Sequence, residues 1–349
     1  MLENVLAAYG MKAGSTSIQP YGNGLINNTW KLISDNRGFI LQKVNTNVFK
    51  SPGDIAFNVN AIGAYLKDHW PDYHFVHPVI TSDGQYLVHD ESGVFRMFPF
   101  VPFSHTKNVA EKPQQAYEAA LQFGRFTCLL SGFNATLLKV TIPSFHDLSL
   151  RYENFVVMLK KGNVERIAAA NHLILTAFKY KNIVDVYESI KINPDFRTRV
   201  THHDTKISNV LFDNNDNGIC VIDLDTTLPG YFISDVGDML RTYICPVSEE
   251  ENDYDKICIR PEFYEAIVMG YYAEMKSELT LSEKNSFFYA GSFMIYMQAI
   301  RFLTDYLDDD RYYGAKYEGH NLTRAGNQFV LLQKYLDAEN KLAYISANL

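Results

Sequence analysis

Cysteine is scarce in this sequence, and the few cysteines form no recognisable motif. Four occur among 349 residues, at Cys128, Cys220, Cys245 and Cys258, without a C-x-x-C pair or a metal-ligand spacing. We therefore expect buried free thiols, which suit a reducing cytoplasm. The N-terminus lacks the charged and apolar regions of a signal peptide, and no apolar run approaches membrane-spanning length. These absences predict a cytoplasmic protein with no membrane partner.

Basic residues are fewer than acidic residues. Lys and Arg number 32 against 40 Asp and Glu, which gives a formal net charge of -8, and no long basic block is present. Such a surface repels nucleic acid, so we expect no nucleic-acid partner. Apolar residues make up 47% and charged residues 21%, an ordinary globular composition that argues against a disordered or fibrous protein. The length favours two lobes that share a cleft.

The expected elements change in kind near Phe103. Before it, β-rich runs at 17–44, 75–80, 85–89 and 94–101 surround one helical pattern at 54–68. After it, helical patterns occupy 113–131, 148–161, 164–187, 261–279, 282–307 and 321–347, with short strands at 199–203, 210–212 and 219–224. The sequence thus predicts an α+β fold, with an antiparallel sheet lobe at 1–103 and a mainly helical lobe at 104–349.

The most informative stretch surrounds the short strands of the second lobe. It contains H-x-D-x-x-x-x-N as His202, Asp204 and Asn209, followed by an I-D-L-D motif that includes Asp223. Phosphoryl transfer needs a carboxylate that orients the acceptor hydroxyl, and an amide oxygen with a second carboxylate to hold Mg²⁺. The spacing therefore predicts Asp204 as the base, and Asn209 and Asp223 as ligands of Mg²⁺.

Two neighbours of Asp204 are interpreted with it. Lys206 lies in the same loop, and we expect it to contact the transferring phosphoryl oxygens as a point charge. His202 is interpreted as a buried organiser of the loop and not as a proton shuttle. An isolated H-x-D is as often a capped turn as a catalytic site, but the three-part spacing between β-type runs favours catalysis.

A glycine-containing turn precedes the catalytic stretch. Gly22, Asn23 and Gly24 lie between the first two strand candidates, where backbone amides can approach the phosphates of ATP. A G-x-G in a hairpin is more often only a turn, and the G-K-[ST] of a Walker loop is absent. Its position ahead of Asp204 makes nucleotide binding our hypothesis for these three residues.

These motifs, in this order, resemble those of the aminoglycoside phosphotransferase and choline kinase superfamily, relatives of the protein kinases. The resemblance implies a protein-kinase-like bilobal fold with ATP and Mg²⁺ as cofactors. It assigns nucleotide binding to residues 1–103, with Phe98 and Phe100 beside the nucleotide near the lobe junction, and catalysis and substrate binding to residues 104–349.

Further segments are similar to the bacterial N-acetylhexosamine 1-kinases, and this likeness extends over nearly the whole chain. They are residues 19–22, 201–206, 222–230, 235–241, 301–307 and 316–324. This resemblance implies phosphorylation of the anomeric hydroxyl of N-acetylglucosamine or N-acetylgalactosamine, which gives the sugar 1-phosphate and ADP. It also implies that Asp204 is the base and that Arg301 contacts the sugar or its phosphate.

The acceptor-site residues have alternative interpretations. A guanidinium binds two oxygens at once, as sugar or phosphate recognition requires, but Arg301 can instead pair with Asp305 one helical turn away. Tyr312 and Tyr317 are candidates to stack on a sugar face, although core packing is the commoner role among 23 tyrosines.

The nucleotide side departs from the superfamily pattern. The third strand usually carries a Lys that holds the phosphates, but here Gln42 aligns with that place and Lys43 points to the opposite face. Either Gln42 serves there or the register differs by one, so both stay candidates. The helical pattern that follows offers Asn58 and Asn60 but no partner Glu.

Two alternatives therefore stay open. The first is a kinase for another acceptor, such as choline, homoserine or an aminoglycoside. The second is a pseudokinase that only binds nucleotide or sugar, against which the intact Asp204, Asn209 and Asp223 argue.

Overall fold

The computed structural model describes residues 2–22 and 26–347. Its N-terminal sheet contains β1 (Ser17–Pro20), β2 (Asn28–Ser34), β3 (Arg37–Val44), β4 (Val88–Asp90) and β5 (Gly93–Pro99), in the order β1-β2-β3-β5-β4. Every neighbouring pair is antiparallel. Asp35 and Asn36 join β2 to β3 with positive φ angles of 49° and 59°, as a tight two-residue hairpin requires.

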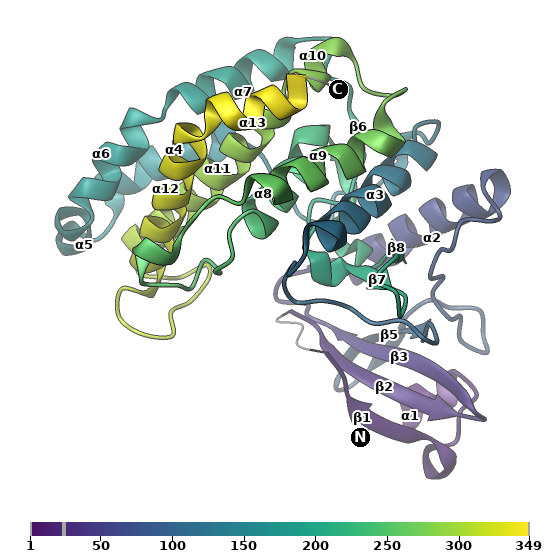
Figure 1. Ribbon diagram of the computed structural model, residues 1–349. Helices are drawn as coiled ribbons and strands as arrows, with labels where there is room; N and C mark the ends of the chain where they lie inside the picture. The colour runs from purple at the N-terminus through teal and green to yellow at the C-terminus, as the bar shows by residue number, and fades with distance from the viewer. Residues whose placement is uncertain (1, 23–25, 348–349) are drawn as a thin grey trace.

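Two helices accompany this sheet in different ways (Figure 1). The short α1 (Glu3–Ala8) packs Val5 and Leu6 onto one face of the sheet, against Leu41 and Phe95 among others. The longer α2 (Pro52–His69) directs its apolar side chains into the core of the helical part instead. The sheet therefore keeps one face free to border a cavity.

The rest of the chain is mainly helical. Its helices are α3 (Pro113–Leu129), α4 (Leu148–Lys161), α5 (Val164–Ala169), α6 (Asn171–Lys179), α7 (Asn182–Ile192), α8 (Phe232–Tyr243), α9 (Pro261–Met275), α10 (Leu281–Lys284), α11 (Phe287–Leu307), α12 (His320–Asp337) and α13 (Glu339–Ala347). At the centre lies α11, which is apolar on nearly all sides because α4, α8 and α12 pack around it.

Two small two-stranded sheets carry the stretch singled out in the sequence. They pair β6 (Arg199–Thr201) with β9 (Leu228–Gly230), and β7 (Val210–Phe212) with β8 (Gly218–Val221). In Figure 1, β7 and β8 lie between the large sheet and the helices. The α+β architecture predicted from the sequence is confirmed.

Several predicted elements are wrong in detail. Residues 75–80 form no strand, and Val79 donates a single backbone hydrogen bond to Met97. The helix expected at 164–187 is divided into α5, α6 and α7, and those expected at 282–307 and 321–347 are each divided in two. Apolar periodicity continues through these breaks, so it could not reveal them.

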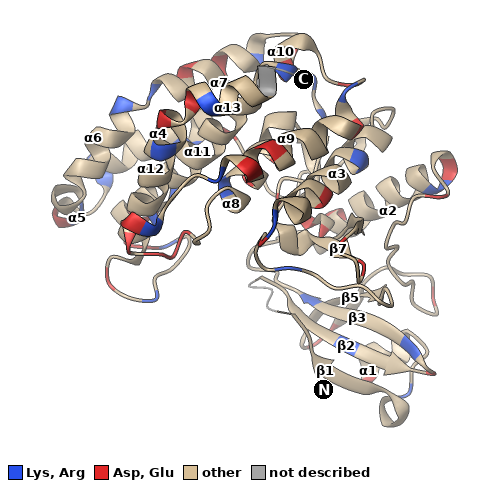
Figure 2. Ribbon diagram, in the orientation of Figure 1, with Lys and Arg blue, Asp and Glu red and all other residues tan. Residues whose placement is uncertain are grey.

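The four cysteines are free, as expected, but they are not all buried. Cys220 and Cys245 are buried, Cys128 is half-buried and Cys258 is exposed. Within residues 2–22 and 26–347, no helix combines the length and the apolar character needed to cross a bilayer. Acidic and basic residues are interspersed over the helices and strands (Figure 2).

Candidate active site

The loop from His202 to Asn209 is fixed by two carboxylates of α8. The backbone N–H groups of His202 and His203 donate to Asp235 at 2.9 and 2.8 Å, and that of Thr205 donates to Asp238 at 2.9 Å. His203 has a positive φ of 65°, a conformation that a non-glycine residue rarely adopts. Buried acceptors on a rigid helix stabilise this conformation and thereby fix Asp204, the next residue.

Asp204 lies at the cavity with a cation beside it. The ammonium of Lys206 is 3.0 Å from its Oδ1, and the side chain of Asn209 donates to its backbone carbonyl at 2.9 Å. Burial acts to raise the pKa of Asp204, but the neighbouring charges and hydrogen bonds, those of Lys206 foremost, together outweigh burial, so the pKa lies below its ordinary value. Asp204 is therefore ionised at neutral pH and able to accept a hydrogen bond from a hydroxyl.

His202 is a structural member of this loop. Its Nε2 donates to the carbonyl of Ile222 at 2.9 Å, and its Nδ1 accepts from the N–H of Asp204 at 3.3 Å. Burial lowers the pKa of His202, which keeps the ring neutral. These contacts agree with the interpretation of His202 as an organiser of the loop.

The β7–β8 hairpin brings Asn209 and Asp223 together. Val210 pairs with Val221, so the residues just outside that pair meet, and the N–H of Ile222 donates to the carbonyl of Asn209 at 2.9 Å. Asp223 has a positive φ of 62° at the turn that follows β8. Burial, and then the charge of Asp225, raise the pKa of Asp223 to about 7.

The residues present fit a magnesium ion. The amide nitrogen of Asn209 is engaged by Asp204, which leaves its oxygen as the atom available to a cation, and Asp223 has no hydrogen bond to a described residue. Mg²⁺ typically takes one or two protein oxygens and completes its shell with phosphates and water. No group of three or more His, Cys, Asp or Glu residues in the described part could hold a metal, and a site of this kind needs none.

A cavity of about 410 Å³ lies between the sheet and the catalytic loop. From the predicted site it is lined by Gly22, Gln42, Phe98, Phe100, Asp204, Lys206, Asn209 and Asp223. Gly22 has a φ of 76°, which glycine adopts without strain. Asn23 and Gly24, the other predicted members of this turn, lie outside the described residues.

Lys43 does not line this cavity. It follows Gln42 on β3, so it points to the other face of the sheet, where its side chain lies against Gly93. The register that places Gln42 toward the nucleotide is the one adopted, and this geometry gives no support to Lys43 as a phosphate ligand.

Two residues that the sequence reasoning missed also line the cavity, Arg96 and Asp225. On the face of the sheet toward the cavity, Ile40 lies opposite Phe98 and Gln42 lies opposite Arg96. The apolar pair of Ile40 and Phe98 suits the adenine of ATP. The polar pair of Gln42 and Arg96 lies about 7 Å further along the strands. The signal in the sequence was a single Arg within the otherwise apolar strand β5.

A smaller cavity of about 150 Å³ contains Arg301. It is lined by Arg151, Asn154, Arg301, Thr304, Asp305, Asp308, Tyr312 and Tyr313, and Tyr317 lines neither cavity. The ring of Tyr317 lies instead against His320 and is 48% exposed. Tyr312 and Arg301 are therefore brought together, and Tyr317 is not.

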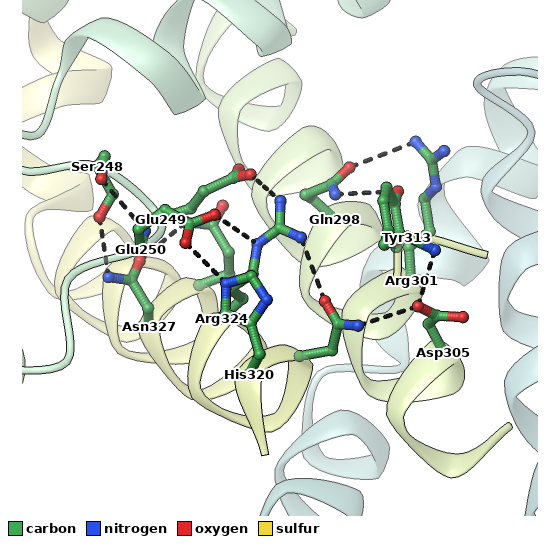
Figure 3. A network of polar contacts seen from close by, with 12 residues as sticks. Ser248, Glu249, Glu250, Gln298, Arg301, Asp305, Tyr313, His320, Arg324 and Asn327 are labelled. Carbon is green, nitrogen blue, oxygen red and sulfur yellow. Dashed lines mark hydrogen bonds and ion pairs between the residues drawn. The ribbon is translucent and has the colours of Figure 1, made fainter. Parts of the chain in front are cut away.

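Arg301 lies among aromatic rings and forms no ion pair with a carboxylate of the described residues. Its guanidinium lies 5.6 Å from the ring of Phe145, 5.9 Å from Tyr312 and 5.5 Å from Tyr313. It donates to Gln298 Oε1 at 3.3 Å, and Gln298 donates to the Tyr313 hydroxyl at 3.1 Å (Figure 3). The alternative pairing with the carboxylate of Asp305 is not formed.

The oxygens of Asp305 have other donors. They accept from the backbone N–H groups of Tyr312 and Tyr313 at 2.7 and 2.9 Å, and from Asn321 at 3.0 Å. Asp305 thus holds the segment that carries both tyrosines, and its oxygens form no ion pair with Arg301.

An ion-pair network connects this region to the catalytic loop. Asp238, which holds the loop, also pairs with Arg241 at 3.1 Å, and Arg241 pairs with Glu249 at 2.7 Å. Glu249 in turn pairs with Arg324, and the neighbouring Glu250 lies 2.7 Å from His320 (Figure 3). The catalytic loop and the helices around Arg301 are therefore positioned by one continuous set of contacts.

Comparison with known proteins identifies the family. A model described as the Phosphotransferase enzyme family (APH) matches residues 17–274. The chain belongs to this family. Members of the Phosphotransferase enzyme family transfer phosphate from ATP to hydroxyl groups, so this chain is a small-molecule phosphotransferase.

Solved structures agree with this fold. An aminoglycoside phosphotransferase from Alicyclobacillus acidocaldarius is 14% identical, with a TM-score of 0.62 over 98% of this chain and 96% of that chain. A microcompartment-associated aminopropanol kinase is 15% identical, with a TM-score of 0.64 over 97% of each. A spectinomycin phosphotransferase in complex with ADP and spectinomycin is 13% identical, with a TM-score of 0.55 over 100% of this chain and 98% of that chain. The kinase-like fold predicted from the sequence is therefore confirmed.

Proposed function

We propose that this phosphotransferase uses ATP and Mg²⁺ to phosphorylate the anomeric hydroxyl of an N-acetylhexosamine, N-acetylglucosamine or N-acetylgalactosamine. The observation that carries the proposal is the guanidinium of Arg301, which lines a cavity near the catalytic loop and pairs with no carboxylate of a described residue. Phe145 and His146 connect it to that loop, since their rings lie 6.3 and 5.0 Å from the ring of His203.

The hydrogen-bond donors of this cavity favour a sugar over an amine as the acceptor. Arg151 also lines it, and burial followed by the charge of Arg301 lowers the pKa of Arg151, although an arginine stays protonated. The Nε of Arg151 is buried and has no hydrogen-bond partner among residues 2–22 and 26–347. Asp305 and Asp308 also line it, but the oxygens of Asp305 already have donors, and Asp308 pairs with Arg311. The groups left to bind an acceptor are therefore guanidinium donors, which suit sugar oxygens better than the cations choline, aminopropanol and aminoglycosides.

The catalytic residues have defined roles in such a transfer. Asp204 accepts a hydrogen bond from the anomeric hydroxyl and takes its proton as the oxygen attacks the γ-phosphorus. The new O–P bond forms while the bond from the γ-phosphorus to the β,γ-bridging oxygen breaks, and ADP is the leaving group. Lys206 offsets charge on the transferring phosphoryl oxygens. Mg²⁺ held by Asn209 and Asp223 supplies further positive charge at the phosphates.

An acceptor panel tests this function. ADP release is expected with N-acetylglucosamine and N-acetylgalactosamine, and not with choline or kanamycin, because the latter two are cationic. Phosphate on the anomeric oxygen is checked by ³¹P NMR. Release with choline alone would exclude the sugar proposal, and no release with any acceptor would favour a pseudokinase.

A substitution of Arg301 tests whether this residue belongs to the acceptor site. Arg301→Gln is expected to raise the KM for the sugar about tenfold or more and leave the KM for ATP unchanged, because one charge-assisted hydrogen bond is lost. Arg37→Gln is the matched control, since Arg37 is exposed at the start of β3 and lines neither cavity. Equal sugar KM values in the two variants would remove Arg301 from the acceptor site.

The apparent affinity for Mg²⁺ is expected to fall as the pH falls through about 7. The pKa of Asp223 is raised to about 7, so in more acidic solution Mg²⁺ must displace a proton from this carboxyl. One such proton lowers the apparent affinity about tenfold between pH 8 and about pH 6. Calorimetric titration of Mg²⁺ with protein and a non-hydrolysable ATP analogue measures this.

The nucleotide contributes its own pH dependence to that titration. A parallel titration without protein measures this part, and the difference belongs to the protein. A difference that does not change with pH would contradict the assignment of Asp223 as a metal ligand.

A further inference from the structure

Two parts of the protein-kinase machinery are missing from their usual places in this chain. In protein kinases a Lys on the third strand contacts the nucleotide phosphates and pairs with a Glu from the following helix. Here β3 presents Gln42 to the cavity, and α2 buries Asn58. Asn58 is occupied elsewhere, because it bonds the N–H and the carbonyl of Lys139 at 2.7 and 2.8 Å. Neither residue brings a charge to the phosphates.

Arg96 brings a positive charge to the same place from the neighbouring strand. It lies directly opposite Gln42 in the β3–β5 ladder, and residues opposite one another project from the same face. Its Nε donates to Gln42 Oε1 at 2.9 Å. The side chain is 5% exposed, yet it lines the large cavity. A cation on β5 can therefore reach the volume that a lysine on β3 would reach.

Asp225 provides the carboxylate that α2 lacks. Both of its oxygens accept hydrogen bonds from Arg96, from Nη1 and, at 2.8 Å, from Nη2. Asn27 also donates to Asp225, at 3.0 Å, and is itself held by the backbone N–H of Asn45 at 3.0 Å. Asp225 is 3% exposed, so this pair is buried and held from several sides.

We propose that Arg96 binds the polyphosphate of ATP, positioned by Gln42 and Asp225, and so replaces the Lys–Glu pair of protein kinases. The inference rests on one part of the proposed function, the binding of ATP. A guanidinium has five N–H donors, and Gln42 and Asp225 take three of them. Two donors remain for phosphate oxygens, so the ion pair need not break when ATP binds.

The arrangement also couples the two parts of the molecule. Arg96 belongs to the sheet, whereas Asp225 lies two residues beyond Asp223 in the turn after β8. The same short turn therefore positions both the phosphate-binding cation and the expected ligand of Mg²⁺. A planar guanidinium suits this double task, because it can bind a carboxylate and a phosphate in one plane.

Nucleotide binding to paired variants tests the role of Arg96. Removing Arg96 alone would leave Asp225 buried without its partner, so the comparison is between Asp225→Asn and the double variant Arg96→Gln/Asp225→Asn. By isothermal titration, ATP and ADP are expected to bind the double variant about 10- to 100-fold more weakly than the single one. Adenosine, which lacks phosphates, is expected to bind both equally. ATP affinities within twofold of each other would overturn the proposal.

A second variant keeps the test decisive if the first double variant does not fold. Arg96→Met/Asp225→Leu replaces the buried pair with apolar side chains, a change that proteins often tolerate. It is expected to bind adenosine as the unaltered protein does and ATP about 10- to 100-fold more weakly. Unchanged ATP binding would again overturn the role of Arg96.

Binding and turnover distinguish this inference from the proposed function. If no acceptor is phosphorylated but the ATP affinities change as expected, the proposed acceptor is wrong and Arg96 keeps its role. If sugars are phosphorylated and the paired variants bind ATP equally, the role of Arg96 alone is wrong. A protein that binds no ATP would contradict both.

Discussion

Asp204→Asn is expected to lower kcat by roughly 10²- to 10⁴-fold, the usual contribution of a general base. The substitution keeps the size of the side chain but removes the negative charge that orients the acceptor hydroxyl and takes its proton. The loop itself should keep its conformation, because Asp235 and Asp238 bind its backbone and not the carboxylate of Asp204. The loss is therefore expected in kcat, with sugar and ATP binding retained.

Steady-state ADP release and calorimetric binding of both substrates measure this separation. The matched control is Asp68→Asn, because Asp68 is an exposed carboxylate near the end of α2 that lines neither cavity. It should leave kcat unchanged. A kcat for Asp204→Asn within about threefold of the control would mean that another group orients the hydroxyl.

The sequence could indicate that the predicted catalytic residues lie together, because they are close along the chain. Asp204, Asn209 and Asp223 lie on either side of one hairpin, and local pairing of Val210 with Val221 is enough to bring them together. The α8 segment that contains Asp235 was noticed only as a resemblance. Its role as the anchor of the loop depends on where α8 packs, which no local pattern specifies.

The nucleotide side was predicted less well for the same reason. The pair of Arg96 with Asp225 joins positions 129 residues apart, and it depends on the register between β3 and β5. The alternation of side chains along β3 correctly separated Gln42 from Lys43. This alternation does not show which residue of a neighbouring strand lies opposite Gln42. The sequence therefore indicated that the lysine of the third strand is absent, but not that Arg96 lies in the same place.

Fold class was easier to predict than the limits of its elements. Asp35 and Asn36 favour the tight turn between β2 and β3, since these residues accept positive φ angles at modest cost. Residues 164–187 have continuous helical periodicity, but the chain leaves the helix near Ala170 and Tyr180 to follow the surface of α11 and α12. Such breaks are set by packing and not by propensity.

Glu283→Ala is expected to lower the free energy of unfolding by about 3–5 kcal/mol, the usual result of removing one member of a buried ion pair. Glu283 is 0% exposed and pairs with Arg199, whose Nη1 and Nη2 lie 2.5 and 2.9 Å from its Oε1 and Oε2. It also accepts from the backbone N–H groups of Arg197 at 3.0 Å and Thr280 at 2.9 Å. Four donors would lose their acceptor, and the charge of Arg199 would stay buried.

Denaturant unfolding followed by circular dichroism measures this loss. Glu265→Ala on α9 is the matched control, because Glu265 is exposed, and it should change stability by no more than about 0.5 kcal/mol. The double variant Arg199→Met/Glu283→Leu separates charge from packing: it removes both charges, so it should be more stable than Glu283→Ala. Arg199 is the first residue of β6, which leads into the loop that carries Asp204. If Glu283→Ala is as stable as the control, β6 is held by its pairing with β9 and not by this ion pair.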